Sequence, residues 1–376
     1  MRRRIAVFVC IIQAILFLGH GILYATCVWF WQPLWQTAGG QDNTAVWWLR
    51  GTIFVLSVSF VAASMLAFNY YNLVVRIFYT IAAAWLGVFN FLLWAACLSW
   101  ILYGIAWSIW SRMPRWPIAS VLFAAAAAAG VYGIINAGRV RTTRITVKLP
   151  NLPAAWRGRT AGLVSDTHLG HVRNRGFIER IVAMLQRAKP DVVFIAGDLY
   201  DGTAADIDGL AEPLDKLAAP LGTYFIAGNH EEFSSHEKYF AAVRRAGVRV
   251  VTNEKVMLDG LQLIGVHYHD ASHPENLRRI LQRLGIDREC ASILLTHAPD
   301  HPQIAAEEGI SLQLSGHTHQ GQFLPYTWIV KRMYRQFAYG LSQLGAMFVY
   351  TSCGAGTWGP PVRLGTNPEI VLITFE

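Results

Sequence analysis

Residues 160–168, Thr-Ala-Gly-Leu-Val-Ser-Asp-Thr-His, place a short apolar run directly before two side chains of metal-binding type, Asp166 and His168. A short apolar run that is closed by polar or turn residues is typical of a buried β-strand. Open α/β sheets place their active sites just beyond the ends of such strands. The stretch therefore predicts a strand with a candidate metal-binding pair at its end.

The same arrangement recurs four times toward the C-terminus. Apolar runs precede Gly-Asp, Gly-Asn-His-Glu, a single His, and Gly-His-Thr-His. Helical patterns lie between these runs, and strands that alternate with helices predict a layered α/β domain. The expected strands cover residues 160–165, 191–196, 223–227, 292–296 and 310–314, and the expected helices cover 177–188, 205–218, 237–246, 275–284 and 302–308.

The polar residues at the strand ends share a preference for divalent metal ions. Oxygen and imidazole donors suit Mn, Fe, Zn or Co, and the absence of cysteine among them argues against a structural zinc site. One ion rarely takes seven protein ligands, so two ions that share a carboxylate, with Asp198 as the bridge, fit the number of ligands. The candidate ligands are Asp166, His168, Asp198, Asn229, His297, His317 and His319.

A two-ion site of this kind suits chemistry at phosphorus. Two ions roughly 3.5–4 Å apart can hold both the attacking and the leaving oxygen of a displacement, and they lower the pKa of a shared water that becomes the nucleophile. Gly197, Gly228 and Gly316 precede ligand positions, where we expect them to let the backbone turn sharply. The motifs therefore indicate hydrolysis of a phosphate ester.

The ordered motifs resemble those of the calcineurin-like metallophosphoesterases, and the resemblance covers residues 157–376. It implies a two-sheet sandwich flanked by helices. It also implies that His230 is a histidine outside the ligand set, which stabilises the transition state or protonates the leaving group. The implied ligands are Asp166, His168 and His319 for a first ion and Asn229, His297 and His317 for a second, with Asp198 between them.

Three further segments resemble the membrane-associated branch of that family: 197–202, 316–322 and the tail 354–370. This resemblance implies a phosphodiesterase that acts on lipids or lipid-linked nucleotides, as UDP-diacylglucosamine hydrolases do. Asp201 is expected either to hydrogen-bond near the site or to belong to a turn before Gly202. The remaining histidines of this half, at positions 171, 236, 267, 269, 273 and 301, are expected to be supporting, loop or surface residues.

The first 138 residues have a different composition. They contain one acidic residue, Asp42, and seven arginines, whereas the rest of the chain contains 25 basic and 23 acidic residues. Four apolar stretches reach the ~20 residues that cross a bilayer, tryptophan and tyrosine cluster at their ends, and none has a polar face. The expected spans are 5–30, 51–71, 77–102 and 117–137.

Arginine counts predict the orientation of these spans. With the N-terminus inside, the inner segments hold seven arginines and the outer loops hold three, so the positive-inside rule places both termini in the cytoplasm. Arg2-Arg3-Arg4 also resembles a twin-arginine export signal. The apolar run that follows is long and lacks a small-residue cleavage site, which favours an uncleaved anchor.

Two basic segments of the second half are candidates for contact with lipid. The joint 139–156 carries four basic residues and is expected to lie against anionic headgroups. Residues 322–344 mix three cations with aromatic side chains, which suits docking onto headgroups and admission of an acyl chain, or alternatively a loop and helix that cover a sheet edge. A net charge of only +2 over residues 139–376 gives nucleic-acid binding little support.

We therefore predict a four-helix transmembrane region (1–138), a basic linker (139–156) and an α/β metallophosphoesterase domain (157–376) in the cell membrane, with the domain in the cytoplasm. The expected reaction is hydrolysis of a phosphodiester or pyrophosphate bond in a lipid, a lipid-linked nucleotide or another small phosphorylated molecule, by attack of a metal-bridging hydroxide. Two alternatives stay open. One is a phosphomonoesterase or protein phosphatase on the same site, and the other is a non-catalytic membrane sensor that binds a phosphorylated ligand.

Overall fold

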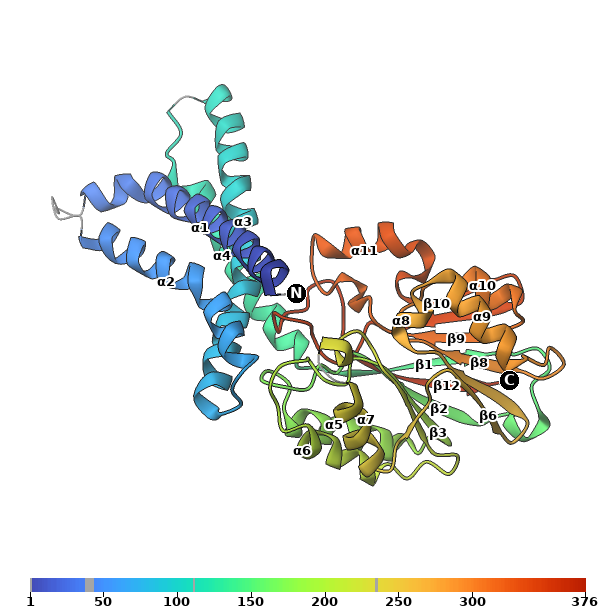
Figure 1. Ribbon diagram of the computed structural model, residues 1–376. Coiled ribbons are helices and arrows are strands. Elements are labelled where there is room, and N and C mark those ends of the chain that lie inside the picture. Colours follow the sequence, from blue (N-terminus) through green and yellow to red (C-terminus); the bar gives the residue numbers. More distant parts are fainter. Residues whose placement is uncertain (1, 38–43, 111, 234–235) are drawn as a thin grey trace. The chain divides into compact units, whose positions relative to one another are not determined.

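The chain folds into two compact units. The computed structural model describes residues 2–37, 44–110, 112–233 and 236–376. One unit, the helical unit, comprises Met1–Ile135 with Gly359–Val362, and the other, the α/β unit, comprises Asn136–Trp358 with Arg363–Glu376. Figure 1 shows the helices of the first and the sheets of the second.

The helical unit contains four long apolar helices, as predicted: α1 (Arg2–Thr37), α2 (Thr44–Ala67), α3 (Leu73–Ile109) and α4 (Trp116–Ala137). Their apolar segments of 29, 24, 37 and 22 residues are each long enough to cross a bilayer. Helices α1 and α3 extend several residues beyond the expected spans, and α1 continues past Pro33 to Thr37.

Polar side chains link the helices of this unit. The Gln13 side chain donates to the carbonyl of Ser57 at 3.0 Å, and the indole N–H of Trp85 donates to Nε2 of His20 at 3.0 Å. These two hydrogen bonds join α1 to α2 and α1 to α3. Asn69, which lies just after α2, donates from its side chain to the carbonyl of Met65 in the last turn of that helix.

The first sheet of the α/β unit has six strands in the order β1-β12-β2-β3-β4-β5. Strands β2 to β5 are parallel, and the C-terminal strand β12 runs antiparallel to β2 and parallel to β1. The strands are β1 (Arg141–Val147), β2 (Thr160–Val164), β3 (Val192–Ala196), β4 (Thr223–Ile226), β5 (Arg249–Val250) and β12 (Glu369–Phe375).

The second sheet has six strands in the order β10-β11-β9-β8-β7-β6. Its four central strands are parallel, and the edge strands β6 and β10 are antiparallel to their neighbours. The strands are β6 (Glu254–Leu258), β7 (Leu261–Gly265), β8 (Ser292–Leu295), β9 (Leu312–Ser315), β10 (Gly340–Leu344) and β11 (Met347–Thr351).

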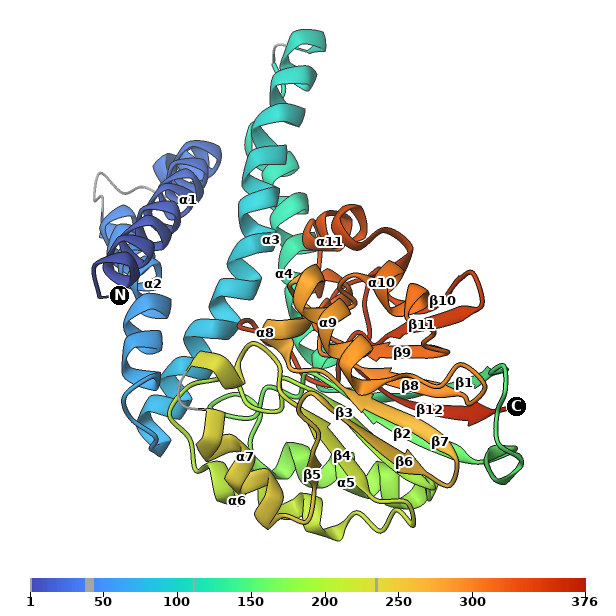
Figure 2. The ribbon, with the colours of Figure 1, turned by 45° about the vertical axis from the view of Figure 1, so that its right-hand side comes forward.

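The two sheets share one apolar core. Leu163 and Phe194 of the first sheet pack in the same buried cluster as Leu263, Ile293 and Leu314 of the second. The outer faces are covered by helices, as Figures 1 and 2 show: α5 (Arg175–Ala188), α6 (Ile207–Ala211) and α7 (His236–Arg245) on one side, and α9 (Pro274–Leu284) and α10 (Pro302–Glu307) on the other. The predicted sandwich flanked by helices is confirmed.

Several elements differ from the expectation. The helix expected at 205–218 is divided into α6 and a 3-10 turn, Glu212–Lys216, which contains Pro213. Within the expected linker 139–156, residues 141–147 form β1 and pair with β12 over their full length. This strand consists of five β-branched residues with Arg141 and Arg144, a composition typical of a half-exposed edge strand. The segment 322–344 contains α11 (Tyr326–Tyr334) and β10.

Candidate metal centre

The candidate ligands lie just beyond the ends of five strands of the α/β unit. Parallel strands bring their carboxyl ends to one edge of a sheet, and the two sheets of the sandwich bring two such edges together. Asp166, Asp198 and Asn229 follow β2, β3 and β4 of the first sheet, and His297 and His317 follow β8 and β9 of the second.

Three of the candidates form a first group: Asp166, His168 and His319. Their ligand atoms all lie within 4.8 Å of one another, and all three side chains are buried. Nε2 of His168 lies 2.9 Å from Nε2 of His319, which is 3.6 Å from Oδ1 of Asp166. The resemblance assigned these residues to one ion, and the fold brings their donor atoms together.

A second group contains Asp198, His297 and His317, whose ligand atoms also lie within 4.8 Å of one another. Nε2 of His297 is 3.2 Å from Oδ2 of Asp198 and 3.1 Å from Nδ1 of His317. The same Nε2 lies 3.1 Å from the side-chain oxygen of Asn229. The four residues expected around a second ion are therefore close together.

Asp198 lies between the two groups. Its Oδ2 is 3.2 Å from Nε2 of His297 and 3.8 Å from Nε2 of His168. Asp198 also forms a close group with His168 and His230. A carboxylate with this placement can reach ions on both sides, as the expected bridge requires.

The donor set fits two divalent ions. The imidazole nitrogens and carboxylate oxygens of each group lie within 4.8 Å of one another, and no described cysteine takes part. Nδ1 of His168 is buried and has no hydrogen-bond partner among the described residues, so this ring is fixed by packing and by its Nε2 contacts. Such a cluster of buried donors is costly without a cation to join them.

The backbone at the centre is strained. Five candidate ligands adopt the left-handed conformation, with φ between 47° and 69°. A residue other than glycine in this region costs on the order of 1–3 kcal/mol, and it persists only where the surrounding structure enforces it. The five residues are Asp166, His168, Asp198, His317 and His319.

The motif glycines serve two different purposes. Gly197 has φ +82°, so it makes the sharp turn that was expected. Gly228 and Gly316 do not have positive φ, and the expectation of a sharp turn is wrong for them. A Cβ added to Gly228 would fall on Oδ1 of Asp198, and one added to Gly316 would fall on Oδ2 of Asp166. These two glycines allow the carboxylates to approach the neighbouring backbone.

His230 has a defined tautomer and position. Its Nδ1 donates to the main-chain carbonyl of Asp201 at 2.8 Å, and its backbone N–H donates to Oδ1 of Asp198 at 2.9 Å. In the neutral ring, Nε2 is therefore the unprotonated nitrogen, and a second proton there makes the ring an acid. The Asp201 carboxylate accepts from the backbone and hydroxyl of Thr203, so Asp201 is a turn residue whose carbonyl also orients His230.

Glu231 is a functional residue to which the sequence reasoning assigned no role, although it completes the Gly-Asn-His-Glu motif. Its buried carboxylate accepts from the backbone N–H groups of Asp198 (3.1 Å), Tyr200 (3.0 Å) and Gly228 (2.7 Å). Burial, with the nearby Asp198 charge, raises the pKa of Glu231 to about 7. Glu231 thus joins the loops after β3 and β4.

Arg363 is the second such residue. It is fully buried, and its guanidinium donates to the carbonyls of Cys353 (2.6 Å), Gly356 (2.7 Å) and His319 (3.3 Å). Its Nη2 also lies 3.2 Å from Nδ1 of His319. Arg363 therefore fastens the C-terminal tail to the last histidine of the first group. Arg363 is the only charged residue between Arg335 and Glu369, and this is the signal that could have drawn attention to it.

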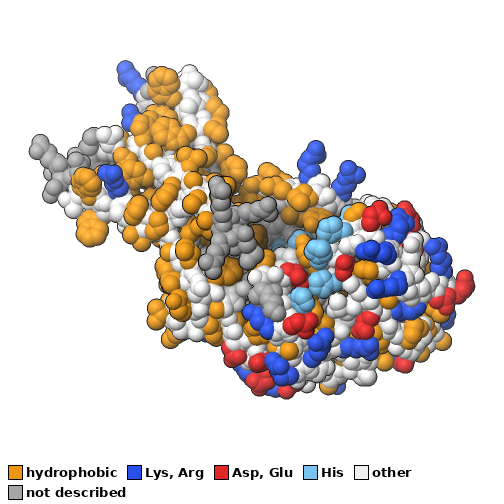
Figure 3. All heavy atoms as spheres, in the orientation of Figure 1, with side chains coloured by type: hydrophobic (Ala, Val, Ile, Leu, Met, Phe, Trp, Pro, Cys, Tyr) orange, Lys and Arg blue, Asp and Glu red, His pale blue; other side chains and the backbone are white. Residues whose placement is uncertain are grey.

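Other histidines lie outside the metal-binding groups found among the described residues, as expected. His171 contacts the hydroxyl of Thr203, and Nε2 of His267 lies 2.9 Å from Glu232. His301 contacts the carbonyl of Ser272. Figure 3 shows histidine side chains gathered on one face of the α/β unit, among acidic and basic residues.

Charge is distributed unevenly between the two groups. Burial lowers the pKa of His297 and the adjacent Asp198 raises it, with the balance at about 10. Asp198 has a pKa well below its usual range, because burial raises it less than His297 and its other histidine neighbours lower it. Burial lowers the pKa of His168 and of His319 well below the usual value. Without metal, the second group thus holds an imidazolium–carboxylate pair and the first holds neutral rings.

Aromatic rings flank the centre. Tyr268 lies beside His297 and His317, with ring centroids 5.6 and 5.9 Å apart, and Tyr334 lies 6.5 Å from His317. On the other side, Phe233 and Trp358 lie 4.5 and 6.4 Å from the His230 ring. These four rings, which we call the aromatic rim, are Phe233, Tyr268, Tyr334 and Trp358.

Comparisons with known proteins agree with this geometry. The family described as "Calcineurin-like phosphoesterase" matches residues 160–321. Two proteins named "Transmembrane protein with metallophosphoesterase domain", from Danio rerio and Bos taurus, are 32% and 33% identical to this chain over the matched residues. Each match covers 65% of this chain and 60% of the relative's length. An "Uncharacterized metallophosphoesterase" of Aquifex aeolicus is 30% identical over 66% of this chain and 96% of its own length. The chain belongs to the calcineurin-like phosphoesterase family.

Proposed function

We propose that this protein is a membrane-anchored phosphoesterase with two divalent ions, held by the seven ligands named above. The observation that carries the proposal is the position of Asp198 between two groups of converging donors. Two ions held in this way supply an activated water and neutralise charge on the phosphate oxygens. Manganese, iron, zinc and cobalt all suit the nitrogen and oxygen donors.

The residues at the centre would then have separate roles. Asp198 and its neighbours would hold the ions, and the left-handed backbone at five ligands keeps their side chains converged. His230, with Nδ1 bound to the Asp201 carbonyl, presents Nε2 for a hydrogen bond to the phosphate or for a proton transfer to the leaving oxygen. Glu231 fixes the loops after β3 and β4 by its hydrogen bonds, and Arg363 fixes the C-terminal tail to His319.

The bond hydrolysed is proposed to be a phosphodiester or a pyrophosphate. A diester carries an organic group on each side of phosphorus, whereas a monoester carries one. In the aromatic rim, Tyr268 lies beside His297 and Tyr334 beside His317. Phe233 and Trp358 lie beside His230, so apolar surface is available on both sides of the centre. This arrangement favours a diester over a phosphomonoester or a phosphoprotein.

The substrate is proposed to be a lipid or a lipid-linked nucleotide. Four helices long enough to span a bilayer belong to the same chain. Anchoring raises the effective concentration of a membrane-borne substrate at the site without any new contact. The arginine distribution supports a cytoplasmic site, so the proposed substrate lies in the inner leaflet.

The reaction is tested with the full chain in detergent. Manganese-dependent cleavage of bis-p-nitrophenyl phosphate is compared with cleavage of p-nitrophenyl phosphate, with and without a chelator. Chelator-sensitive cleavage that prefers the diester supports the proposal, and a preference for the monoester contradicts the diester assignment. Cleavage of neither compound, by protein that binds two ions, would favour a binding role without turnover.

The lipid assignment needs its own comparison. The same preparation is given a lipid-linked nucleotide diphosphate and the matching water-soluble nucleotide diphosphate without acyl chains, in mixed micelles. Faster cleavage of the acylated compound supports a lipid substrate. Equal rates with both would contradict it while leaving the phosphodiesterase assignment intact.

A further inference from the structure

We propose that α11 and the residue after it form a docking surface for the headgroup region of an anionic membrane. The surface, which we call the α11 face, comprises Trp328, Ile329, Lys331, Arg332, Met333 and Arg335. The proposal concerns contact with lipid, so it holds whatever bond the metal centre cleaves.

The proposal rests first on the exposure of the apolar side chains of α11. No residue of this helix is buried, and Trp328 and Met333 are 70% and 67% exposed. Thr327, Val330 and Tyr334, spaced by three and four residues, are partly buried and form its inward face. Large apolar side chains that project from a folded unit mark a surface that another phase or molecule covers.

The proposal rests second on the positive charge of the α11 face. No acidic residue occurs between Glu308 and Glu369 in the sequence. Elsewhere in the α/β unit, surface arginines such as Arg175 and Arg278 pair with glutamates. Lys331, Arg332 and Arg335 form no ion pair with any described residue. Cations that lack an internal counter-charge are available for an external anion.

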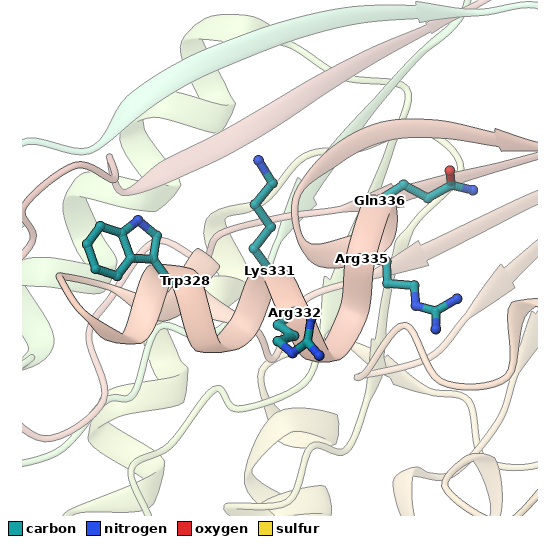
Figure 4. A pocket seen from close by; sticks show the side chains of 5 residues that line it. All are labelled: Trp328, Lys331, Arg332, Arg335 and Gln336. Carbon is teal, nitrogen blue, oxygen red and sulfur yellow. The ribbon is translucent and has the colours of Figure 1, made fainter.

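The α11 face combines these two features in one place. Figure 4 shows the side chains that line a shallow hollow of about 760 Å³: Trp328, Lys331, Arg332, Arg335 and Gln336. A phosphate headgroup takes charge-assisted hydrogen bonds from arginine and lysine, while tryptophan prefers the boundary between headgroups and acyl chains. Protruding Trp, Ile and Met with adjacent cations are typical of helices that lie in the plane of a membrane surface.

A bilayer is the occupant that the chain itself supports. Its four apolar helices place it at a membrane, so α11 meets lipid at high local concentration. Nucleic acid would use the cations and leave Ile329 and Met333 in water. The inward face of α11 ends at Tyr334, whose ring lies 6.5 Å from that of His317, so a headgroup bound at the α11 face would be close to the metal centre.

The test places an environment-sensitive NBD label on the α11 face of the full chain. The background replaces Cys10, Cys27, Cys97 and Cys290 with serine and keeps the buried Cys353. Met333→Cys carries the label, and the matched control is Met257→Cys, an exposed methionine on β6 (55% exposed). Both chains are placed in nanodiscs of phosphatidylcholine, with and without phosphatidylglycerol, that contain doxyl-labelled lipid as the quencher.

We expect lipid-borne quenching at position 333, stronger with phosphatidylglycerol, and little quenching at 257. Replacing Lys331, Arg332 and Arg335 with glutamine should weaken quenching at 333, because each cation strengthens binding to an anionic surface about fivefold. Equal quenching at 333 and 257 would overturn the proposal, because α11 would then face water or a protein partner instead of lipid. Quenching at 333 that is unchanged in the triple variant would overturn the headgroup contact. A thermal midpoint measured for every variant verifies that each remains folded.

Discussion

The two groups of candidate ligands differ in enclosure and in charge. In the first group, Asp166, His168 and His319 are all buried, and Nη2 of Arg363 lies 3.2 Å from Nδ1 of His319. In the second group, His317 and Asn229 are partly exposed, and Asn229 brings a neutral amide oxygen instead of a charged one. A metal ion gains more from buried, charged and preorganised donors. We therefore expect the first ion to bind more tightly than the second.

The strongest test of a shared centre is Asp198→Ala. Because this carboxylate serves both groups, its loss should remove both ions and reduce diester turnover by at least about 10³-fold, as loss of one member of a cooperating catalytic set does. Metal content and initial rates measure the effect. Asp208→Ala, an exposed aspartate that pairs with Arg245, is the matched control and should behave as the unsubstituted chain. Retention of two ions by Asp198→Ala would refute the bridging role.

His319→Ala and Asn229→Ala separate the two groups. We expect His319→Ala to lose the first ion and most turnover, with no recovery in excess metal. Asn229→Ala should weaken the second ion on the order of 10- to 100-fold and regain turnover when metal is added, because its amide is the weakest donor. Activity measured against metal concentration distinguishes them. Identical metal dependence in both variants would show that the groups are not distinct.

Arg363 should affect the first group alone. Arg363→Lys keeps the charge but loses the planar fork of donors that reaches the carbonyls of Cys353, Gly356 and His319. We expect the first ion to bind about 10- to 100-fold more weakly, with the second unchanged. Competition with a chelating dye reports both affinities. A lower thermal midpoint with both affinities intact would mean that Arg363 supports only the fold.

Proton release should also differ between the two groups, and it changes affinity by about tenfold for each pH unit. The pKa of His297 is about 10 because of Asp198, so this ring is protonated at pH 7 and must lose its proton to bind the second ion. Affinity at the second group should therefore rise about tenfold per pH unit up to that value. Burial raises the pKa of Asp166 to about 6, so affinity at the first group should fall only below that pH. Calorimetry in buffers of different ionisation enthalpy counts the protons, and release of none at pH 7 would contradict the assignment.

The sequence predicted the elements that lie directly beside the motifs. Strands β2, β3, β4, β8 and β9 were expected within one or two residues of their observed bounds, because each is a short apolar run with a polar end. Strands β1 and β12 were not expected, since β1 is basic and β12 has no motif after it. They pair across more than 200 residues of sequence, from Arg141 with Glu369 to Val147 with Phe375.

The supporting residues were the other part that could not be predicted. Glu231 and Arg363 act partly through hydrogen bonds to backbone groups 33 and 44 residues away, and no local pattern indicates which carbonyl or N–H a side chain will reach. Gly228 was interpreted as a turn residue, although its role is to leave room for Asp198. Such roles depend on which loops meet, and that is a property of the two sheets packed together.

By itself, the sequence determined the two-part character of the chain and the chemistry of its donors, because span length, charge and ligand type are local properties. Only the tertiary structure decided that Asp198 lies between two groups, that five ligands adopt a left-handed backbone and that the cations of the α11 face have no carboxylate partner among the described residues. These features arise where strands distant in sequence end at a common edge, and packing of the sandwich provides the energy that holds strained and buried polar groups in place.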